Sequence, residues 1–230
     1  TLEITEKDPY QLVTSADTHC EQIIIDILQN SFPNSGFICE ESGEINNNND
    51  MTWIIDPIDG THNFIHQFPY FCISIGCKIN NKLEHGLIFN PLTQDIYFAS
   101  KGKGAQKNNT KIRVDPHKQL RHSVLLQQAR LDNMKEDTYL KSILNLKNAG
   151  AGIRQTGSTA LDLAHVSSGQ ANLLFTYNPK IWDYAAGVVI AKEAGAIVCD
   201  LKGGTEFGEK NGLIAGNPKL VIEFIKTLNK

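Results

Sequence analysis

Residues 53–64 read Trp-Ile-Ile-Asp-Pro-Ile-Asp-Gly-Thr-His-Asn-Phe, so an apolar segment runs directly into two carboxylates and a glycine. The three apolar residues predict the end of a buried strand. Because Pro57 fixes its own φ and has no N–H, we expect the chain to leave the strand between Asp56 and Asp59. Gly60 then permits an unusual backbone angle or a close approach to a ligand, and Thr61 can begin a helix.

This arrangement places two acidic side chains opposite the N–H groups of a helix start. Carboxylate oxygens bind Mg²⁺, and the N–H groups at a helix start bind phosphate. The combination indicates metal-assisted phosphate chemistry. The alternative is an ordinary turn, because Asp-Pro and Asp-Gly pairs are common turn residues, and an isolated Asp-x-x-Asp-Gly favours that interpretation.

Length and composition describe an ordinary globular chain. Its 230 residues can bury a substantial core, as one large domain or two small ones. The net charge of −3 gives no overall basic signal for nucleic acid. No apolar run has transmembrane length and no signal peptide is visible, so we expect no membrane partner.

Five cysteines stand at positions 20, 39, 72, 77 and 199. An odd number without a Cys-x-x-Cys pair argues against a disulfide framework and against a zinc knuckle. We therefore expect core thiols in a reducing compartment, which predicts a cytoplasmic protein.

Strands and helices alternate along the predicted order, which indicates a layered α/β protein in two halves, residues 1–115 and 116–230, divided near Asp115-Pro116. A helix after Thr14 or Ser15 has a candidate apolar stripe at Ile23, Ile24, Ile27 and Leu28. The Gly-rich basic segment 101–105 is interpreted as a hairpin turn. Further strands are expected at 36–39, 70–79, 83–89, 95–99, 124–126, 171–176 and 213–216, and further helices at 134–146, 161–168, around 183–194 and at 218–228.

Three other segments place acids or small hydroxyl residues where an element starts or ends. Asp17 and Asp183 each stand at a predicted helix start, where an acid ordinarily complements the helix dipole. Glu40 directly follows an apolar strand, although adjacent acids in a loop are usually solvated charge. Gly157-Ser158-Thr159 precedes a helix, where it can cap the helix or present N–H groups to a substrate.

Taken together, these motifs resemble those of the inositol monophosphatase family, a group of Mg²⁺-dependent, lithium-sensitive phosphatases. The resemblance runs from Lys7 to the C-terminus and implies an αβαβα sandwich of the inositol monophosphatase and fructose-1,6-bisphosphatase type. It rests on Leu12-Val13-Thr14, Glu40-Glu41-Ser42, the 53–64 stretch, Phe68-Pro69, Gly157-Ser158, Trp182-Asp183 and Glu193-Ala194-Gly195.

The resemblance also implies a set of metal ligands. Glu40, Asp56 and the Ile58 carbonyl would hold a first Mg²⁺, and Asp56, Asp59 and Asp183 a second. A third ion would lie near Glu40 with mostly water ligands, giving two to three ions in all. The implied reaction is hydrolysis of a phosphomonoester by a metal-activated water, with inositol-1-phosphate as the expected substrate.

The implied catalytic residues are Thr61, Asp17 and Glu40, of which Thr61 and Asp17 would orient the water and accept its proton. Gly60 and Thr61 would hold the phosphate through their N–H groups. The residues implied on the substrate side are Asp59, Gly157, Ser158, Thr159 and Asp183.

Two departures from the family pattern bear on function. Thr176 stands where the family's inositol phosphatases usually carry a glutamate that contacts sugar hydroxyls, which leaves fructose-1,6-bisphosphate, adenosine bisphosphates and NADP as alternative substrates. His62 replaces a small polar residue and is expected to be exposed. The resemblance further implies a homodimer and, from a bacterial subgroup linked to transcription complexes, an alternative role in association with RNA polymerase.

Overall fold

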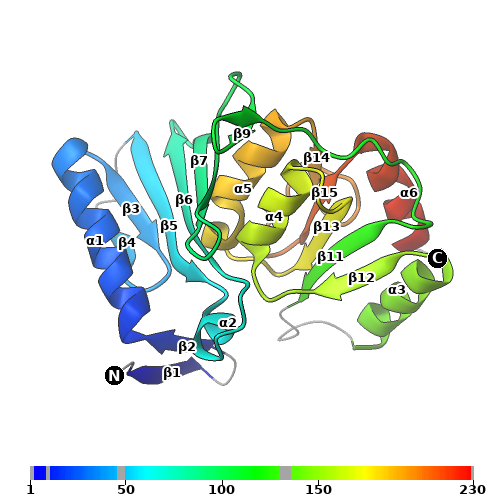
Figure 1. The fold of residues 1–230 in the computed structure, drawn as a ribbon, viewed down its shortest axis with the longest axis horizontal. Helices are drawn as coiled ribbons and strands as arrows, with labels where there is room; N and C mark the ends of the chain where they lie inside the picture. Colours follow the sequence, from blue (N-terminus) through cyan, green and yellow to red (C-terminus); the bar gives the residue numbers. More distant parts are fainter. Residues whose placement is uncertain (1–2, 9–10, 46–49, 130–135, 229–230) are drawn as a thin grey trace.

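Helices and sheets alternate in five layers across the molecule, in the order helix, sheet, helix, sheet, helix (Figure 1). The computed structural model describes residues 3–8, 11–45, 50–129 and 136–228. This αβαβα arrangement confirms the predicted fold class. The outer helical layers are α1 (Ser15–Ser31) on one side and α3 (Glu136–Asn148) with α6 (Pro218–Leu228) on the other, and α4 (Thr159–Ser167) and α5 (Ile181–Glu193) form the central layer.

The first sheet, as far as the chain is described, has eight strands in the spatial order β10-β9-β8-β7-β6-β5-β3-β4. β3 and β5 pair in parallel, and the other neighbours pair antiparallel. The hairpin expected around 101–105 connects β8 to β9, so that prediction is confirmed. The strands are β3 (Gly36–Cys39), β4 (Gly43–Ile45), β5 (Met51–Asp59), β6 (Cys72–Ile79), β7 (Lys82–Asn90), β8 (Asp95–Ser100), β9 (Ala105–Lys107) and β10 (Thr110–Lys111).

The second sheet has five strands within the described ranges, in the order β12-β11-β13-β15-β14. The first three run parallel, and β15 lies antiparallel to both of its neighbours. Of the helix expected at 134–146, residues 134 and 135 lie outside the described part of the chain. The strands are β11 (Val124–Ala129), β12 (Gly152–Gln155), β13 (Leu173–Tyr177), β14 (Ile197–Cys199) and β15 (Leu213–Gly216).

β5 does not end where the sequence predicts. The strand continues through Pro57 to Asp59, with a bulge in its pairing to β6 between Asp56 and Asp59. The expectation that the chain leaves the strand at Pro57 is therefore wrong. β3 is in register with β5 only as far as Ile55, and the bulge interrupts the other ladder. Proline is tolerated at such a position because no ladder hydrogen bond requires its N–H.

A second difference concerns the N-terminal region. β1 (Ile4–Asp8) and β2 (Gln11–Thr14) form an antiparallel pair that the sequence did not predict. Two short strands without an apolar alternation carry little periodic signal. The pair leads directly into α1, where the Ser15 N–H donates to the Glu3 carbonyl at 2.9 Å.

The buried stripe of α1 also differs from the prediction. Ile23 and Ile27 are 45% and 60% exposed, whereas Asp17, Glu21 and Ile25 are buried. These three residues recur every four positions and so share one face of the helix. The helix therefore turns two carboxylates inward. Of the predicted stripe, Ile24 and Leu28 pack against the core, and Ile23 and Ile27 are turned out to solvent.

α5 lies between the two sheets and is buried on all sides from Ala185 to Ala191. A helix enclosed in this way needs no polar stripe. It approaches β7 so closely that a Cβ on Gly86 would lie 2.2 Å from the Ala186 carbonyl oxygen. Glycine at this position allows the helix to lie against the sheet, and its first turn carries Asp183 to the end of β5.

The five cysteines are free thiols, and all except the half-buried Cys20 lie in the core, as predicted. No helix in the described part of the chain combines the length and apolar character needed to cross a membrane. The division into residues 1–115 and 116–230 stays a prediction, since α4 and α5 of the second half pack against the first sheet.

Candidate active site

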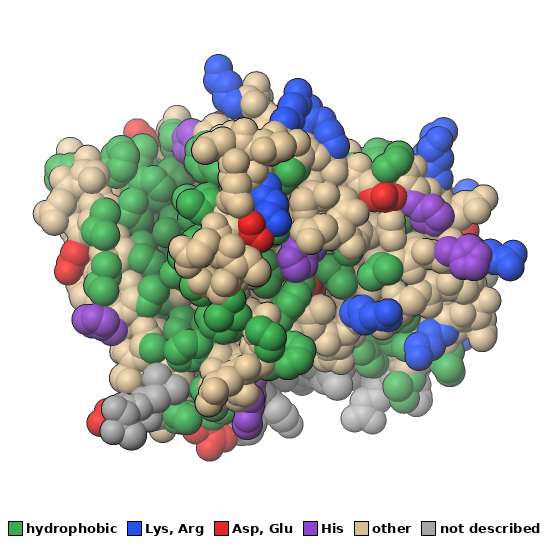
Figure 2. All heavy atoms as spheres, viewed as in Figure 1, with side chains coloured by type: hydrophobic (Ala, Val, Ile, Leu, Met, Phe, Trp, Pro, Cys, Tyr) green, Lys and Arg blue, Asp and Glu red, His purple; other side chains and the backbone are tan. Residues whose placement is uncertain are grey.

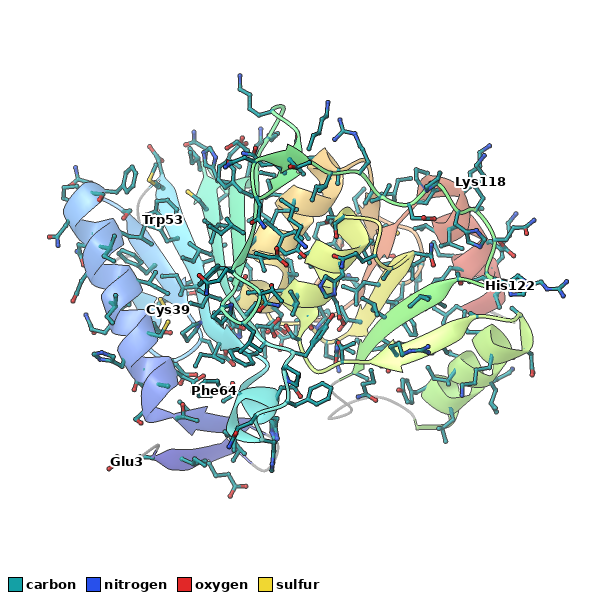
Figure 3. The ribbon with its side chains drawn as sticks, in the orientation of Figure 1. Glu3, Cys39, Trp53, Phe64, Lys118 and His122 are labelled. Atoms are coloured by element: carbon teal, nitrogen blue, oxygen red, sulfur yellow. The ribbon has the colours of Figure 1, made fainter. Side chains whose placement is uncertain are left out.

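The acidic residues of β5 lie where the first sheet meets the N-termini of two helices. Asp59 Oδ2 accepts hydrogen bonds from the Ser158 hydroxyl at 2.7 Å and from the Ala160 N–H at 2.6 Å, both at the start of α4. Asp183 lies in the first turn of α5. Cys39, which directly precedes Glu40, and Phe64 of α2 (Thr61–Ile65) lie on the N-terminal side of this junction (Figure 3).

Asp56 is buried among the other acids of this group. It is 1% exposed, and its Oδ1 accepts the Ile58 N–H at 3.1 Å. Burial is the first cause that raises its pKa well above the usual range, and the negative charges of Glu40, Asp59 and Asp183 add to the effect. A cation is the partner that would allow these carboxyls to be ionised together.

Asp59 is perturbed in the same direction. Burial and the charge of Asp183 raise its pKa to about 7, against the lowering effect of the hydrogen bonds from Ser158 and Ala160. Asp183 also has the ordinary role of a helix-start acid, since its Oδ2 accepts the Lys180 N–H at 2.8 Å. Capping and membership of the acidic group thus coexist in one side chain.

The group fits a hard divalent cation, because it offers oxygen ligands on three buried carboxyls, Asp56, Asp59 and Asp183, and on the partly buried Glu40. The candidates are those predicted from the sequence: Glu40, Asp56, the Ile58 carbonyl, Asp59 and Asp183. Among the described residues, no three acidic, histidine or cysteine side chains already converge as a complete metal site would. Glu40 is hydrogen-bonded to Asp56, so an ion would have to separate this pair.

Asp17 and Thr61 are brought together from positions 44 residues apart. The Thr61 hydroxyl lies 3.4 Å from Asp17 Oδ1 and 3.1 Å from the Ile58 carbonyl oxygen. Asp17 Oδ2 meanwhile accepts the Thr14 N–H and hydroxyl at 2.8 and 2.5 Å, completing a capping box on α1. The ordinary capping role and the predicted contact with Thr61 use different oxygens of the same carboxylate.

The loop that carries Glu40 is held by a residue that the sequence analysis missed. Glu21 is 1% exposed and accepts the N–H groups of Glu41 and Ser42 at 3.0 and 2.9 Å, together with the Ser42 hydroxyl. Glu21 is four positions from Asp17 and from Ile25, and this spacing predicts that the three side chains share one face of α1. Glu21 therefore fixes the loop next to Glu40 from the inner face of α1.

Gly60 joins the central motif to the substrate-side turn. Its φ of 103° is left-handed, and a Cβ there would lie 3.1 Å from the Tyr70 carbonyl oxygen and 3.3 Å from that of Gly157. The unusual backbone angle expected of this glycine is confirmed, and its close approach is to the carbonyl groups of Tyr70 and Gly157. α2 has only five residues, so its dipole contributes little, and the predicted phosphate contact depends on the first N–H groups themselves.

The substrate-side turn has an ordinary structural role as well. Ser158 is the N-cap of α4, and its hydroxyl accepts the Leu161 N–H at 3.4 Å. Thr159, 7% exposed, is the first helical residue. The turn is placed beside the acidic group by the hydrogen bonds from Ser158 and Ala160 to Asp59.

Two positions concern the departures from the family pattern. His62 is exposed, as expected. Thr176 is 2% exposed and lies in β13 opposite Gln128 of β11. A small buried hydroxyl at this position supplies no carboxylate for substrate hydroxyls.

Comparisons with known proteins agree with this arrangement. A model of the inositol monophosphatase family matches residues 1–230. The chain is 37% identical over 235 residues to "Nus factor SuhB" of Pseudomonas aeruginosa, covering 99% of this chain and 86% of that protein. Its structure is similar, with a TM-score of 0.96 and 36% identity, to the extragenic suppressor protein SuhB of Bartonella henselae, covering 100% of this chain and 89% of that one. An IMPase/NADP phosphatase solved with NADP and Ca²⁺ is similar with a TM-score of 0.87 and 27% identity, covering 99% and 86% of the two chains.

Proposed function

The chain belongs to the inositol monophosphatase family, and from this premise we propose that it is a Mg²⁺-dependent phosphomonoester hydrolase acting on inositol-1-phosphate. The supporting observation is the group of buried carboxyls at the end of β5, whose charges raise one another's pKa. Such a group needs a cation to be ionised near neutral pH. A related IMPase/NADP phosphatase was solved with Ca²⁺, another hard divalent ion.

The residues that would hold the ions are Glu40, Asp56, Asp59, Asp183 and the Ile58 carbonyl. Bound Mg²⁺ supplies charge neutralisation for the ester and lowers the pKa of a coordinated water. Two to three ions are proposed, in keeping with the number of available oxygens.

The chain's own residues would move the proton and orient the ester. The Thr61 hydroxyl, while donating to Asp17 Oδ1, can accept a proton from the attacking water and pass one to Asp17. Glu40 faces Asp56 and would help to orient that water. The N–H groups of Gly60 and Thr61 would hold the phosphate oxygens at the start of α2.

The remaining proposed contacts lie on the side of α4. Ser158 and the Ala160 N–H hold one oxygen of Asp59, which leaves its other oxygen for an ion. Gly157, Ser158 and Thr159 would line the part of the site that receives the alcohol group of the ester, a small phosphorylated polyol or sugar. Fructose-1,6-bisphosphate, an adenosine bisphosphate or NADP would replace inositol-1-phosphate if binding of the polyol needs the glutamate that Thr176 replaces.

Phosphate release from purified protein tests this proposal. Inositol-1-phosphate, fructose-1,6-bisphosphate, an adenosine bisphosphate and NADP would be compared with Mg²⁺, with Ca²⁺ and with a chelator. Mg²⁺-dependent release that favours inositol-1-phosphate supports the proposal. Release that favours another ester keeps the chemistry and changes the substrate. No release from any ester, with Mg²⁺ binding intact by calorimetry, overturns the proposed activity.

A second candidate function comes from the relative named "Nus factor SuhB". We propose, as the alternative, that this chain associates with RNA polymerase in a transcription complex. Asp56→Asn separates the two functions, because it removes a proposed metal ligand. Capture of purified polymerase by this variant supports the alternative. If the variant loses both capture and turnover, any association with polymerase depends on the metal-bound site. The homodimer stays a prediction, which light scattering of the purified protein would test.

A further inference from the structure

A buried acid outside the proposed metal ligands gathers hydrogen bonds from both halves of the chain. Asp162 of α4 is fully buried. Its Oδ1 accepts the Tyr70 hydroxyl at 2.6 Å and the Thr156 hydroxyl at 2.7 Å, and its Oδ2 accepts the Gln128 amide at 2.9 Å. Among the described residues, none of the ion pairs involves Asp162.

Asp162 occupies the first turn of α4, where an acid ordinarily complements the helix dipole. Its carboxylate serves a different purpose, because the three donors come from the segment before β6, from β11 and from the residue after β12. Burial raises the pKa of Asp162 to about 7. Holding an acid here without a cation is costly, since a buried carboxylate is stabilised only by its hydrogen bonds.

Asn63 of α2 binds the same two partners from the other side. Its Nδ2 donates to the Tyr70 carbonyl at 2.7 Å and to the Thr156 carbonyl at 2.8 Å. Tyr70 and Thr156 are therefore each held twice, at the hydroxyl by Asp162 and at the carbonyl by Asn63. Because Tyr70 precedes β6 and Thr156 follows β12, these four bonds connect the first sheet to the second.

Thr156 begins the segment that reaches Asp59. A Cβ on Gly157 would lie 2.8 Å from Asn63 Nδ2, so this residue packs directly on the amide. Ser158 and Ala160 then donate to Asp59 Oδ2. The segment is consequently held at its start by Asn63 and Asp162 and at its end by the acid at the end of β5.

We propose that Asp162 is a positioning residue for the reaction proposed above. It holds Thr156 and Tyr70 so that the turn at 156–160 lies against Asp59 and against the ester to be cleaved. Asp162 touches neither the ester nor an ion, and it acts through the turn. The effect on catalysis rests on the proposed function, whereas the effect on the position of the turn rests on the hydrogen bonds alone.

Asp162→Asn is the first test, because asparagine keeps the shape of the side chain but has one acceptor oxygen in place of two, so either Gln128 or the two hydroxyls lose their acceptor. We expect kcat/KM to fall about 10–100-fold, as for other residues that orient a site without contacting the reacting atoms. Faster amide hydrogen exchange over residues 156–160 should accompany the loss. Asp200→Asn is the control, since Asp200 is a buried carboxylate that accepts the N–H groups of Lys202 and Gly204 in a turn after β14.

A polarity swap separates positioning from mere folding. In Asp162→Asn combined with Gln128→Glu, the new amide can donate to the new carboxylate, and the Thr156 hydroxyl, which accepts the Gln128 amide at 2.7 Å in the wild type, can donate to that carboxylate instead. Recovery of kcat/KM and of exchange protection in the double variant supports the proposal. Asp162→Asn with unchanged kcat/KM and unchanged exchange at 156–160 overturns it, even where the melting temperature falls. If the wild-type protein releases no phosphate from any ester, the proposed function alone fails, and the exchange measurement still decides whether Asp162 holds the turn.

Discussion

The Ser158 hydroxyl donates a 2.7 Å hydrogen bond to Asp59 Oδ2 and so ties the N-terminus of α4 to the end of β5. This bond lowers the pKa of Asp59, against the effects of burial and of Asp183. Ser158→Ala should therefore raise that pKa and weaken Mg²⁺ binding near neutral pH. A hydrogen bond to a charged group contributes about 1.5–3 kcal/mol, so we expect a loss of roughly 10–100-fold in Mg²⁺ affinity, measured by calorimetry.

Ser168→Ala is the matched control, because Ser168 ends the same helix and its hydroxyl binds carbonyl groups there. Equal effects of the two substitutions would show that helix stability, rather than Asp59, accounts for the result.

Asp56→Asn should have opposite effects on stability and on activity. Asp56 is buried against Glu40, Asp59 and Asp183, so removing its charge relieves repulsion in the metal-free protein. We expect a higher melting temperature without Mg²⁺ and a loss of turnover of at least roughly 100-fold, since residues that merely support metal ligands cost up to that much. Asp26→Asn, on the exposed face of α1, should change neither quantity. A variant with wild-type turnover would remove Asp56 from the proposed mechanism.

The effect of Mg²⁺ on stability should depend on pH. The pKa of Asp59 is raised from 3.8 to about 7, so the folded protein binds more protons than the unfolded chain between these values. Without metal, this group therefore lowers the free energy of unfolding as pH rises through that window. Because Mg²⁺ requires the ionised carboxylate, it should offset the loss at high pH and compete with protons at low pH.

Thermal unfolding with and without Mg²⁺ measures this dependence. The rise in melting temperature caused by Mg²⁺ should be larger at about pH 8 than at about pH 5.5. In Asp59→Asn, the difference between the Mg²⁺ effects at the two pH values should become smaller. An equal Mg²⁺ effect at both pH values in the wild type would contradict the proposed involvement of Asp59.

The positions of the acids could be predicted from the sequence because each lies at the end of an apolar strand segment or at the start of a helix. Asp56, Asp59 and Asp183 stand at such points, and the structure places them together. The course of β5 through Pro57 could not be predicted, since a bulge depends on pairing with β6 and not on local residues. The assignment of roles to these acids stays a prediction.

The hydrogen bonds made by Asp162 and Glu21 could not be predicted from the sequence for a different reason. Asp162 binds partners 6, 34 and 92 positions away, and no local pattern records such distances. Glu21 was more accessible, because its spacing of four from Asp17 and Ile25 placed it on their face. The predicted apolar stripe of Ile23, Ile24, Ile27 and Leu28 is correct only for Ile24 and Leu28, because a helix that turns carboxylates toward a polar site departs from simple hydrophobic periodicity.

The space between α5 and the first sheet gives a final prediction. A Cβ at Gly86 would lie 2.2 Å from the Ala186 carbonyl oxygen, a backbone atom that can move only with its helix. Gly86→Ala should therefore push α5 away from β7 and carry Asp183 away from Asp59. Overpacking typically costs about 1–3 kcal/mol of stability, which denaturant unfolding would measure, and turnover well below the melting temperature should fall as well. Gly152→Ala is the control, because Gly152 is also in a strand and the nearest atom to its Cβ would be 3.5 Å away. A Gly86 variant that is less stable but turns over at the wild-type rate would show that the position of Asp183 does not depend on this contact.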